Sequence, residues 1–202
     1  MLNVFARASI SRVVDPIGAA LVRAGLTPNA MTLIGTVGAI VCALAFFPND
    51  MLLWGTFTVW GFAMVDMLDG AMARATKSTP FGAVLDSTCD RLTDGAVFAA
   101  IAWWAFTVAE DGVTAGVALF VLVLAQVISY IKARAEASGL NADGGLIERA
   151  ERLIIALVGT GLEGFGVPYA IPVSLWLLAV LSVLTLVQRV RSARTSAREV
   201  TP

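Results

Sequence analysis

The chain has 202 residues, of which 58% are hydrophobic and 14% are charged, and its mean hydropathy is +0.82. Soluble domains typically contain about 45–50% apolar and about 25% charged residues, so this composition argues against a soluble protein and predicts a membrane protein. With two cysteines and no histidine, neither a disulfide framework nor a Cys/His zinc site is supported, and any metal ion must be held by oxygen atoms.

The first 26 residues predict an amphipathic helix that lies in the membrane interface. They offer no uninterrupted apolar run followed by a cleavage site, so we expect them to remain in the mature protein. The alternative is a helix packed on the cytoplasmic ends of the membrane helices. The apolar residues that recur at helical spacing are Ile10, Val13, Val14, Ile17 and Leu21, while Arg12, Asp15 and Arg23 lie elsewhere on the helix.

The stretch "TPNAMT", residues 27–32, predicts the start of the next helix. Thr27 can cap the helix and Pro28 suits its first position. Asn29 and Thr32 are three residues apart, so they share a face near the positive end of that helix.

Six apolar segments predict six transmembrane helices in an all-α integral membrane protein. We expect one membrane domain over residues 1–202, with the bundle at 27–190 and a cytoplasmic tail at 191–202. Several segments have fewer than the ~20 apolar residues that a span needs, so the second and third helices should continue through neighbouring aspartates. The segments are 31–47, 51–73, 91–109, 113–133, 153–162 continuing towards 166, and 168–188.

The distribution of charge predicts the orientation in the membrane. All fourteen Lys and Arg residues fall in the N-terminal segment, the loops after the second and fourth spans with their flanks, and the C-terminus. The other connections, "PND", "EDG" and "LEGFGVP", carry only acidic charges. The positive-inside rule therefore places both termini and the aspartate-rich loop on the cytoplasmic side of the plasma membrane.

Four aspartates stand out in "DMLDGAMARATKSTPFGAVLDSTCD", residues 66–90. Asp66 and Asp69 are neighbours at i, i+3 on a helix, and Asp86 and Asp90 are neighbours at i, i+4. The short connection makes the two helices adjacent, so the four carboxylates should converge. Such charge at membrane depth indicates function and calls for a neutralising cation. Oxygen ligands favour a hard divalent ion, most plausibly Mg²⁺.

The neighbours of these aspartates suit a phosphate-bearing substrate. Arg74 follows on the same helix, and a metal ion beside an arginine can clamp a pyrophosphate during displacement of a phosphoryl group. Gly70 and Gly82 lack a Cβ and would let a nucleotide or phosphate approach the backbone. Asp94, by contrast, is interpreted as a solvated carboxylate at the end of a span.

The stretch resembles the signature of the CDP-alcohol phosphotransferase family, D-x-x-D-G-x-x-A-R, a short gap, then G-x-x-x-D-x-x-x-D. The resemblance implies transfer of a phosphatidyl group from CDP-diacylglycerol to an alcohol, with CMP as leaving group, with Mg²⁺ as cofactor and Mn²⁺ as the alternative. It also implies a homodimer. The matching residues are Asp66, Asp69, Gly70, Ala73, Arg74, Gly82, Asp86 and Asp90.

The resemblance also implies roles for individual residues. Asp66, Asp69, Asp86 and Asp90 would ligate the metal, and Asp90 would also be the general base. The gap leaves open which of Ser78 and Thr79 faces the substrate. The residues expected to contact CDP-diacylglycerol are Asn29, Ala30, Met31, Thr32, Asp66, Asp69, Gly70, Arg74, Thr79 and Gly82.

Cations in the later part of the chain resemble those of the bacterial branch of the family that makes phosphatidylinositol phosphate. Lysine and arginine bind a phosphomonoester by charge-assisted hydrogen bonds. We therefore predict that Lys132 and Arg152, with Arg189 or Arg191, bind inositol 1-phosphate (1D-myo-inositol 3-phosphate).

Several alternatives remain at this point. The same cations can serve only to orient the protein in the membrane. Glycerol 3-phosphate would also require a cationic pocket, so the alternative within the family is a phosphatidylglycerol-phosphate synthase. From other classes, a non-catalytic membrane scaffold would use Gly and Ala rows as packing faces. A divalent-cation carrier would use the aspartates as its selectivity site. The clustering of all four aspartates near one end, with no matching acid in the middle of another span, argues against the carrier.

Overall fold

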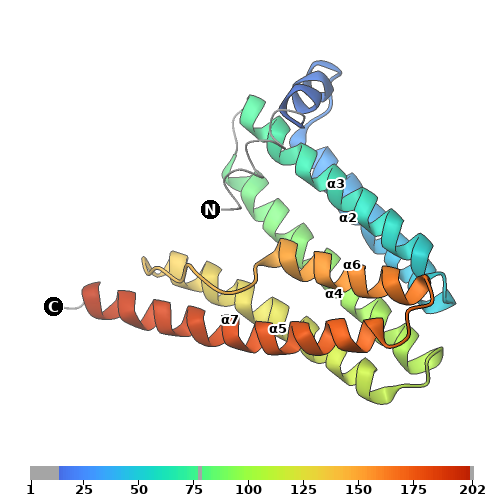
Figure 1. Cartoon of the computed structure of the whole chain (residues 1–202). Helices are drawn as coiled ribbons and strands as arrows, with labels where there is room; N and C mark the ends of the chain where they lie inside the picture. Colours follow the sequence, from blue (N-terminus) through green and yellow to red (C-terminus); the bar gives the residue numbers. More distant parts are fainter. Residues whose placement is uncertain (1–13, 77–78, 201–202) are drawn as a thin grey trace. The chain divides into compact units, whose positions relative to one another are not determined.

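The structure is a computed structural model that describes residues 14–76 and 79–200. These residues form helices and no strands, so the predicted all-α class is confirmed for the described part of the chain (Figure 1). A helix over residues 14–23 comes first. The elements that follow are α2 (Pro28–Phe46), the 3₁₀ turn η1 (Phe47–Asn49), α3 (Leu52–Thr76), α4 (Pro80–Thr107), α5 (Gly112–Ala137), α6 (Arg149–Gly164) and α7 (Ala170–Val200).

The predicted start of the first long helix is confirmed. Helix α2 begins at Pro28, and the Thr27 hydroxyl oxygen accepts a hydrogen bond from the Ala30 amide at 3.3 Å. Of the N-terminal segment, only the part from residue 14 is described, and Ile10 and Val13 lie outside it. The interfacial location of this segment stays a prediction.

The six predicted segments correspond to helices α2 to α7, but the number of spans is not settled by the structure. Among the described residues, three stretches are long and apolar enough to cross a membrane by length and composition, Pro28–Asn49, Gly112–Ala137 and Ala170–Arg198. These apolar helices identify a membrane protein, while the count of six spans stays a prediction. Helix α7 continues to Val200, through most of the predicted tail, because that segment is rich in the helix formers Ala and Arg.

The surface of α2 shows why this protein needs a membrane. Leu33, Val37 and Val41 recur every four residues and are each about half exposed. Residues at this spacing form one stripe along a helix. Soluble monomers rarely expose large contiguous apolar patches, so the stripe suits contact with lipid.

The chain forms two compact units. The first comprises Met1–Ala43 and Phe57–Thr93, and the second comprises Leu44–Thr56 and Asp94–Pro202. The first unit contains the four predicted metal ligands, and the second contains the cations predicted to bind the acceptor. The prediction of one membrane domain over the whole chain stays a prediction.

Within the first unit, α2 and α3 lie side by side (Figure 1). Glycines on α2 allow the close approach. A Cβ added to Gly38 would lie 2.2 Å from the ring of Phe62, and one on Gly35 would lie 3.4 Å from the Phe62 carbonyl oxygen. Small residues of this kind bring membrane helices together, and here they hold the start of α2 near the aspartates of α3.

Within the second unit, α7 packs against α5 and α6. Ile128 of α5 and Leu178 of α7 are fully buried. Polar contacts join the chain segments at one end of this unit: the Trp104 indole N–H donates to Asp50 at 2.7 Å, and the hydroxyls of Thr56 and Thr160 lie 2.7 Å apart. Each of these contacts gives a polar group among the apolar helices a hydrogen-bond partner.

Candidate active site

Three of the four predicted metal ligands come together. Asp66 and Asp69 of α3 and Asp86 of α4 each offer a carboxylate oxygen, and these oxygens lie within 4.8 Å of one another. The i, i+3 spacing on α3 places its two carboxylates on one face, and Asp69 is buried. Three oxygen donors at this separation fit a hard divalent cation. Their role as ligands stays a prediction.

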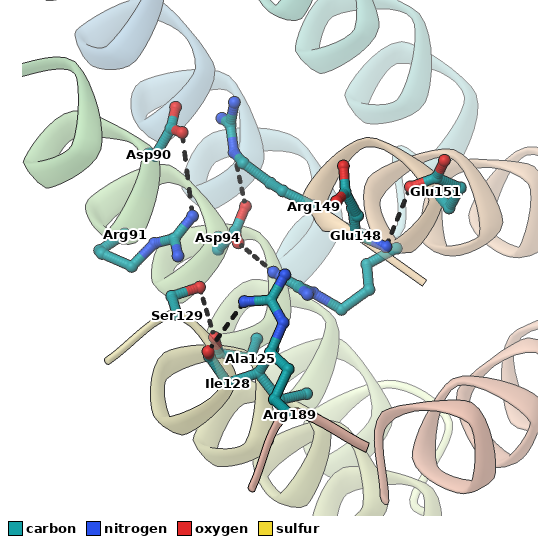
Figure 2. Close-up of polar contacts among 11 residues, drawn as sticks. Asp90, Arg91, Asp94, Ala125, Ile128, Ser129, Glu148, Arg149, Glu151 and Arg189 are labelled. Atoms are coloured by element: carbon teal, nitrogen blue, oxygen red, sulfur yellow. Dashed lines mark hydrogen bonds and ion pairs between the residues drawn. The ribbon is translucent and has the colours of Figure 1, made fainter. Parts of the chain in front are cut away.

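Asp90 stands outside this group of three. It follows Asp86 by four residues on α4, and its Oδ2 lies 3.8 Å from a terminal nitrogen of Arg91 (Figure 2). The expected convergence of four carboxylates is thus shown for three of them. The predicted roles of Asp90 as a ligand and as general base are not tested by this geometry.

The first turn of α2 contacts the aspartate cluster. The Thr32 hydroxyl donates a hydrogen bond to Oδ2 of Asp69 and also lies 3.1 Å from the Pro28 carbonyl oxygen. Thr32 itself is buried. A buried carboxylate that accepts a hydrogen bond is fixed in orientation, so Thr32 determines which way one of the metal-facing groups points.

A pocket of about 440 Å³ lies beside the cluster, and all its walls belong to the first unit. The first turns of α2 and α4 both open onto it, and helix N-termini present backbone N–H groups and a positive dipole to an anion. This arrangement suits a diphosphate. The lining residues are Pro28, Asn29, Thr32, Asp69, Gly70, Ala73, Thr76, Thr79, Gly82, Ala83 and Asp86.

Gly82 lies beside two residues that are predicted to contact CDP-diacylglycerol, Thr79 and Asn29. A Cβ at this position would lie 3.1 Å from the hydroxyl oxygen of Thr79 and 3.3 Å from the side-chain oxygen of Asn29. The same Thr79 oxygen accepts a hydrogen bond from the Gly82 amide at 3.0 Å, which caps α4. Of the two candidates left open by the sequence, Thr79 lines the pocket, and Ser78 lies outside the described residues.

Three other residues predicted to contact CDP-diacylglycerol, Ala30, Met31 and Arg74, do not line the pocket. Met31 is buried. Arg74 points its guanidinium to Asp15 of the N-terminal helix at 2.6 Å, and both side chains are about half exposed. Their roles toward the donor stay predictions.

Four residues that line the pocket, Pro28, Ala73, Thr76 and Ala83, were not predicted to contact the donor, and helical spacing identifies the last two. Thr76 follows Asp69 by seven residues, so it lies two turns away on the same face of α3. Ala83 precedes Asp86 by three residues on α4 and also lines the pocket. Asp15 was missed as a partner of Arg74, and no local pattern predicts a contact across 59 residues.

The cations predicted to bind the acceptor all lie in the second unit. The Lys132 ammonium is 3.4 Å from Asp143. Arg189 is buried and donates to two carbonyl oxygens, of Ile128 at 3.0 Å and of Gly144 at 3.1 Å. Arg191, two residues further along α7, is exposed. Arg189 is therefore held in place by backbone groups, whereas Arg191 presents its side chain to the surface.

The interpretation of Asp94 as a solvated carboxylate was wrong. Asp94 is 3% exposed, and its two oxygens face two arginines of α6. Oδ1 lies 3.3 Å from Nε of Arg149, and Oδ2 lies 3.3 Å from Nη2 of Arg152, which is 2% exposed. The error arose because the partners lie more than 50 residues away in the sequence.

Comparison with known protein families decides the family. The profile of the CDP-alcohol phosphatidyltransferases matches residues 25–194. The chain belongs to the CDP-alcohol phosphatidyltransferase family. Among curated proteins, the phosphatidylinositol phosphate synthase of Mycobacteroides abscessus is 51% identical over 198 residues, which cover 97% of this chain and 90% of that protein. The synthase of Corynebacterium glutamicum is 48% identical over 192 residues, 94% of this chain and 87% of that protein.

Solved structures of another family member are also similar to this chain. The Mycobacterium tuberculosis phosphatidylinositol phosphate synthase with CDP-diacylglycerol bound matches with a TM-score of 0.89 and 50% identity, covering 95% of this chain and 98% of that one. The same relative in complex with manganese and citrate matches with a TM-score of 0.88 and 50% identity, covering 94% and 92%. The family fold thus extends over nearly the whole chain.

Proposed function

We propose that this chain transfers the phosphatidyl group of CDP-diacylglycerol to an inositol phosphate, giving phosphatidylinositol phosphate and CMP. The observation that carries the proposal is the pocket beside the three-aspartate cluster, lined by residues of the family signature. Support comes from relatives about 50% identical over nearly their full lengths that carry this activity in their names. One of them was solved with CDP-diacylglycerol bound.

The pocket would hold the CDP part of the donor. The positive ends of helices α2 and α4 suit the diphosphate, and Gly70 and Gly82 leave room for it near the backbone. Asn29, which lines the pocket, would contact the cytidine. Arg74 would add a charge-assisted hydrogen bond to a phosphate oxygen. The acyl chains of the donor would remain among the apolar helix faces.

The aspartates fit a divalent cation, because all the ligand atoms that they offer are carboxylate oxygens. We propose that Asp66, Asp69, Asp86 and Asp90 hold Mg²⁺, with Mn²⁺ as the alternative; a relative was solved with manganese. When bound, such an ion neutralises the negative charge that develops on the diphosphate. The Thr32 hydroxyl keeps the Asp69 carboxylate in one orientation.

The transfer exchanges one phosphorus–oxygen bond for another. The acceptor hydroxyl oxygen bonds to the phosphorus that carries diacylglycerol, and the bond from that phosphorus to the bridging oxygen breaks. CMP leaves with the bridging oxygen and its electron pair. Asp90 takes the proton of the acceptor hydroxyl, as a carboxylate that stays ionised beside a cation can do.

The acceptor phosphate is assigned to the cations of the second unit. Lys132 and Arg152, with Arg189 or Arg191, would give charge-assisted hydrogen bonds to a phosphomonoester. This is the basis for preferring inositol phosphate to unphosphorylated inositol. Glycerol 3-phosphate carries the same group, so it is the competing acceptor.

Location and assembly form part of the same proposal. The charge distribution favours six spans in the plasma membrane with both termini cytoplasmic, and the family resemblance implies a homodimer. Single cysteines at Asn49 and Ser138, after Cys42 and Cys89 are replaced by alanine, test the topology. Labelling of both positions from the same side of the membrane would contradict it.

The proposed base gives the first prediction. Purified protein in lipid vesicles should release CMP from CDP-diacylglycerol only with a divalent ion and an acceptor. Asp90→Asn should abolish turnover while CDP-diacylglycerol still binds, because the amide cannot take the proton. Glu110→Gln, a matched change at an exposed acid outside the site, should turn over normally. Unchanged turnover in Asp90→Asn would remove Asp90 from the base role.

A further inference from the structure

A single buried carboxylate joins two arginines at the start of α6. Asp94 contacts Nε of Arg149 through one oxygen and Nη2 of Arg152 through the other, both at 3.3 Å. Asp94 and Arg152 are almost fully buried, whereas the Arg149 side chain remains 25% exposed. The same carboxylate therefore orients a buried arginine, Arg152, and a partly exposed one, Arg149.

The local structure of α6 supports this arrangement. Arg149 and Arg152 are three residues apart and share a face of the first helical turn. The Glu148 amide donates to the Glu151 carboxylate at 3.0 Å (Figure 2), a bond typical of a helix start that fixes where the turn begins. The turn therefore brings both arginines to Asp94 in a defined register.

The orientation of Arg149 is informative. Asp94 binds its Nε, and Figure 2 shows the two terminal nitrogens of Arg149 turned away from Asp94. The three side chains together carry two positive charges and one negative. Such a group favours an anion at the accessible arginine, where its terminal nitrogens can form a two-point contact with phosphate oxygens.

We infer that Asp94 is a positioning residue of the acceptor site, which orients Arg149 and Arg152 so that they receive the phosphate of the acceptor, with Arg149 as an additional phosphate contact. This inference rests on the proposed function and adds residues to it. Asp94 itself touches neither the substrate nor the reacting atoms. It lies outside the family signature, which ends at Asp90.

An effect of charge alone and a loss of orientation would change the KM for the acceptor in opposite directions. Asp94→Asn raises the net charge of the three residues from +1 to +2, so charge alone would lower the KM for a phosphorylated acceptor. Loss of orientation would raise it instead. We expect a rise of about tenfold or more, as for a lost hydrogen bond to a charged group. The KM for CDP-diacylglycerol should remain at the wild-type value.

A second pair of variants repeats the test with fewer buried charges. Arg149→Gln leaves Asp94 paired with Arg152, and adding Asp94→Asn removes this acid from Arg152. Charge alone predicts that the double variant has a lower acceptor KM than Arg149→Gln, and positioning predicts a higher one. The double variant buries one cation fewer than Asp94→Asn alone. Comparing it with Arg149→Gln therefore still tests the inference if Asp94→Asn alone fails to fold.

The experiment measures CMP release in lipid vesicles with 1D-myo-inositol 3-phosphate, and with glycerol 3-phosphate if the wild type prefers it. A wild type that uses only unphosphorylated alcohols would defeat the proposed function itself. The present inference is overturned by an unchanged or lower acceptor KM in the Asp94 variants. Loss of CDP-diacylglycerol binding in all of them would also overturn it, because Asp94 would then be required for the fold.

Discussion

At the scale of single residues, the pocket that we assign to the donor depends on small side chains in fixed positions. Gly70 lines the pocket, and a Cβ there would meet only the Arg74 guanidinium, at an ordinary 3.6 Å. An alanine would therefore fit the protein and intrude on the ligand. At Gly82 an added Cβ would instead press on Thr79 and Asn29. Gly70 is thus the cleaner test of space for the donor.

Gly70→Ala should raise the KM for CDP-diacylglycerol several-fold without loss of stability. The added methyl group occupies donor space, while Ala in a helix is about 0.5–1 kcal/mol more favourable than Gly. Steady-state kinetics and thermal unfolding in detergent measure the two effects. Gly61→Ala, on the same helix with open space around the added Cβ, is the control. An unchanged donor KM would show that the diphosphate does not lie against Gly70.

At the scale of elements, the site depends on how closely α2 approaches α3, because Thr32 and Asp69 belong to different helices. Gly38 is the tightest point, where an added Cβ would overlap the Phe62 ring. The sequence predicted the helices, the cap at Thr27 and the shared face of Asp66 and Asp69, because all of these follow from local spacing.

Contacts between distant segments could not be predicted in the same way. Neither the pairing of Arg74 with Asp15 nor the burial of Asp94 between arginines follows from local spacing. Both depend on tertiary packing between residues more than 50 positions apart. Thr76 and Ala83, in contrast, follow from helical periodicity once the aspartates are known, so the pocket could have been predicted more completely than it was.

Gly38→Ala should destabilise the protein by about 1–3 kcal/mol, the usual range for overpacking a well-packed site. The shift of α2 should also weaken Mn²⁺ binding, because Thr32 would lose its alignment with Asp69. Thermal unfolding and Mn²⁺ titration measure these effects, with Gly61→Ala again as control. Equal melting temperatures for the two variants would show that the contact between Gly38 and Phe62 is loose.

The cap of α5 gives a pH-dependent prediction. Asp111 accepts hydrogen bonds from the Thr114 hydroxyl at 2.6 Å and from the amides of Thr114 and Val113 at 3.0 Å each. These bonds, with the Thr114 side chain first, lower the pKa of Asp111 below its ordinary 3.8. A lowered pKa stabilises the fold above the ordinary value, and this contribution is lost as the pH falls through the pKa in the folded state.

Asp111→Asn should therefore melt at a lower temperature than the wild type at pH 7. The difference should shrink as the pH falls below 3.8, because the wild-type carboxylate then becomes neutral as well. Thermal unfolding of both proteins across this range measures the difference directly. Asparagine is chosen because it retains a side chain that can cap the helix. A difference that stays constant with pH would mean that the carboxylate charge does not contribute to the cap.

At the scale of the whole molecule, the residues that we assign to the donor and those that we assign to the acceptor belong to different units. The aspartates and the donor pocket lie in the first unit, and the cations that we assign to the acceptor lie in the second. On the proposed function, the donor carries a charged nucleotide and lipid tails, so its metal site would stand at the edge of an apolar protein. That role would account for the many carboxylates in one short stretch of a chain with a mean hydropathy of +0.82.

The central claim concerns the acceptor, and one measurement tests it most directly. Wild-type protein in vesicles containing CDP-diacylglycerol and a divalent ion is given inositol phosphate, inositol or glycerol 3-phosphate, and kcat/KM is determined from CMP release with the lipid product identified by mass spectrometry. We expect the highest kcat/KM with inositol phosphate and a product that is phosphatidylinositol phosphate. A higher value with inositol or with glycerol 3-phosphate would contradict the proposed acceptor, and absence of CMP release with all three would contradict the transferase itself.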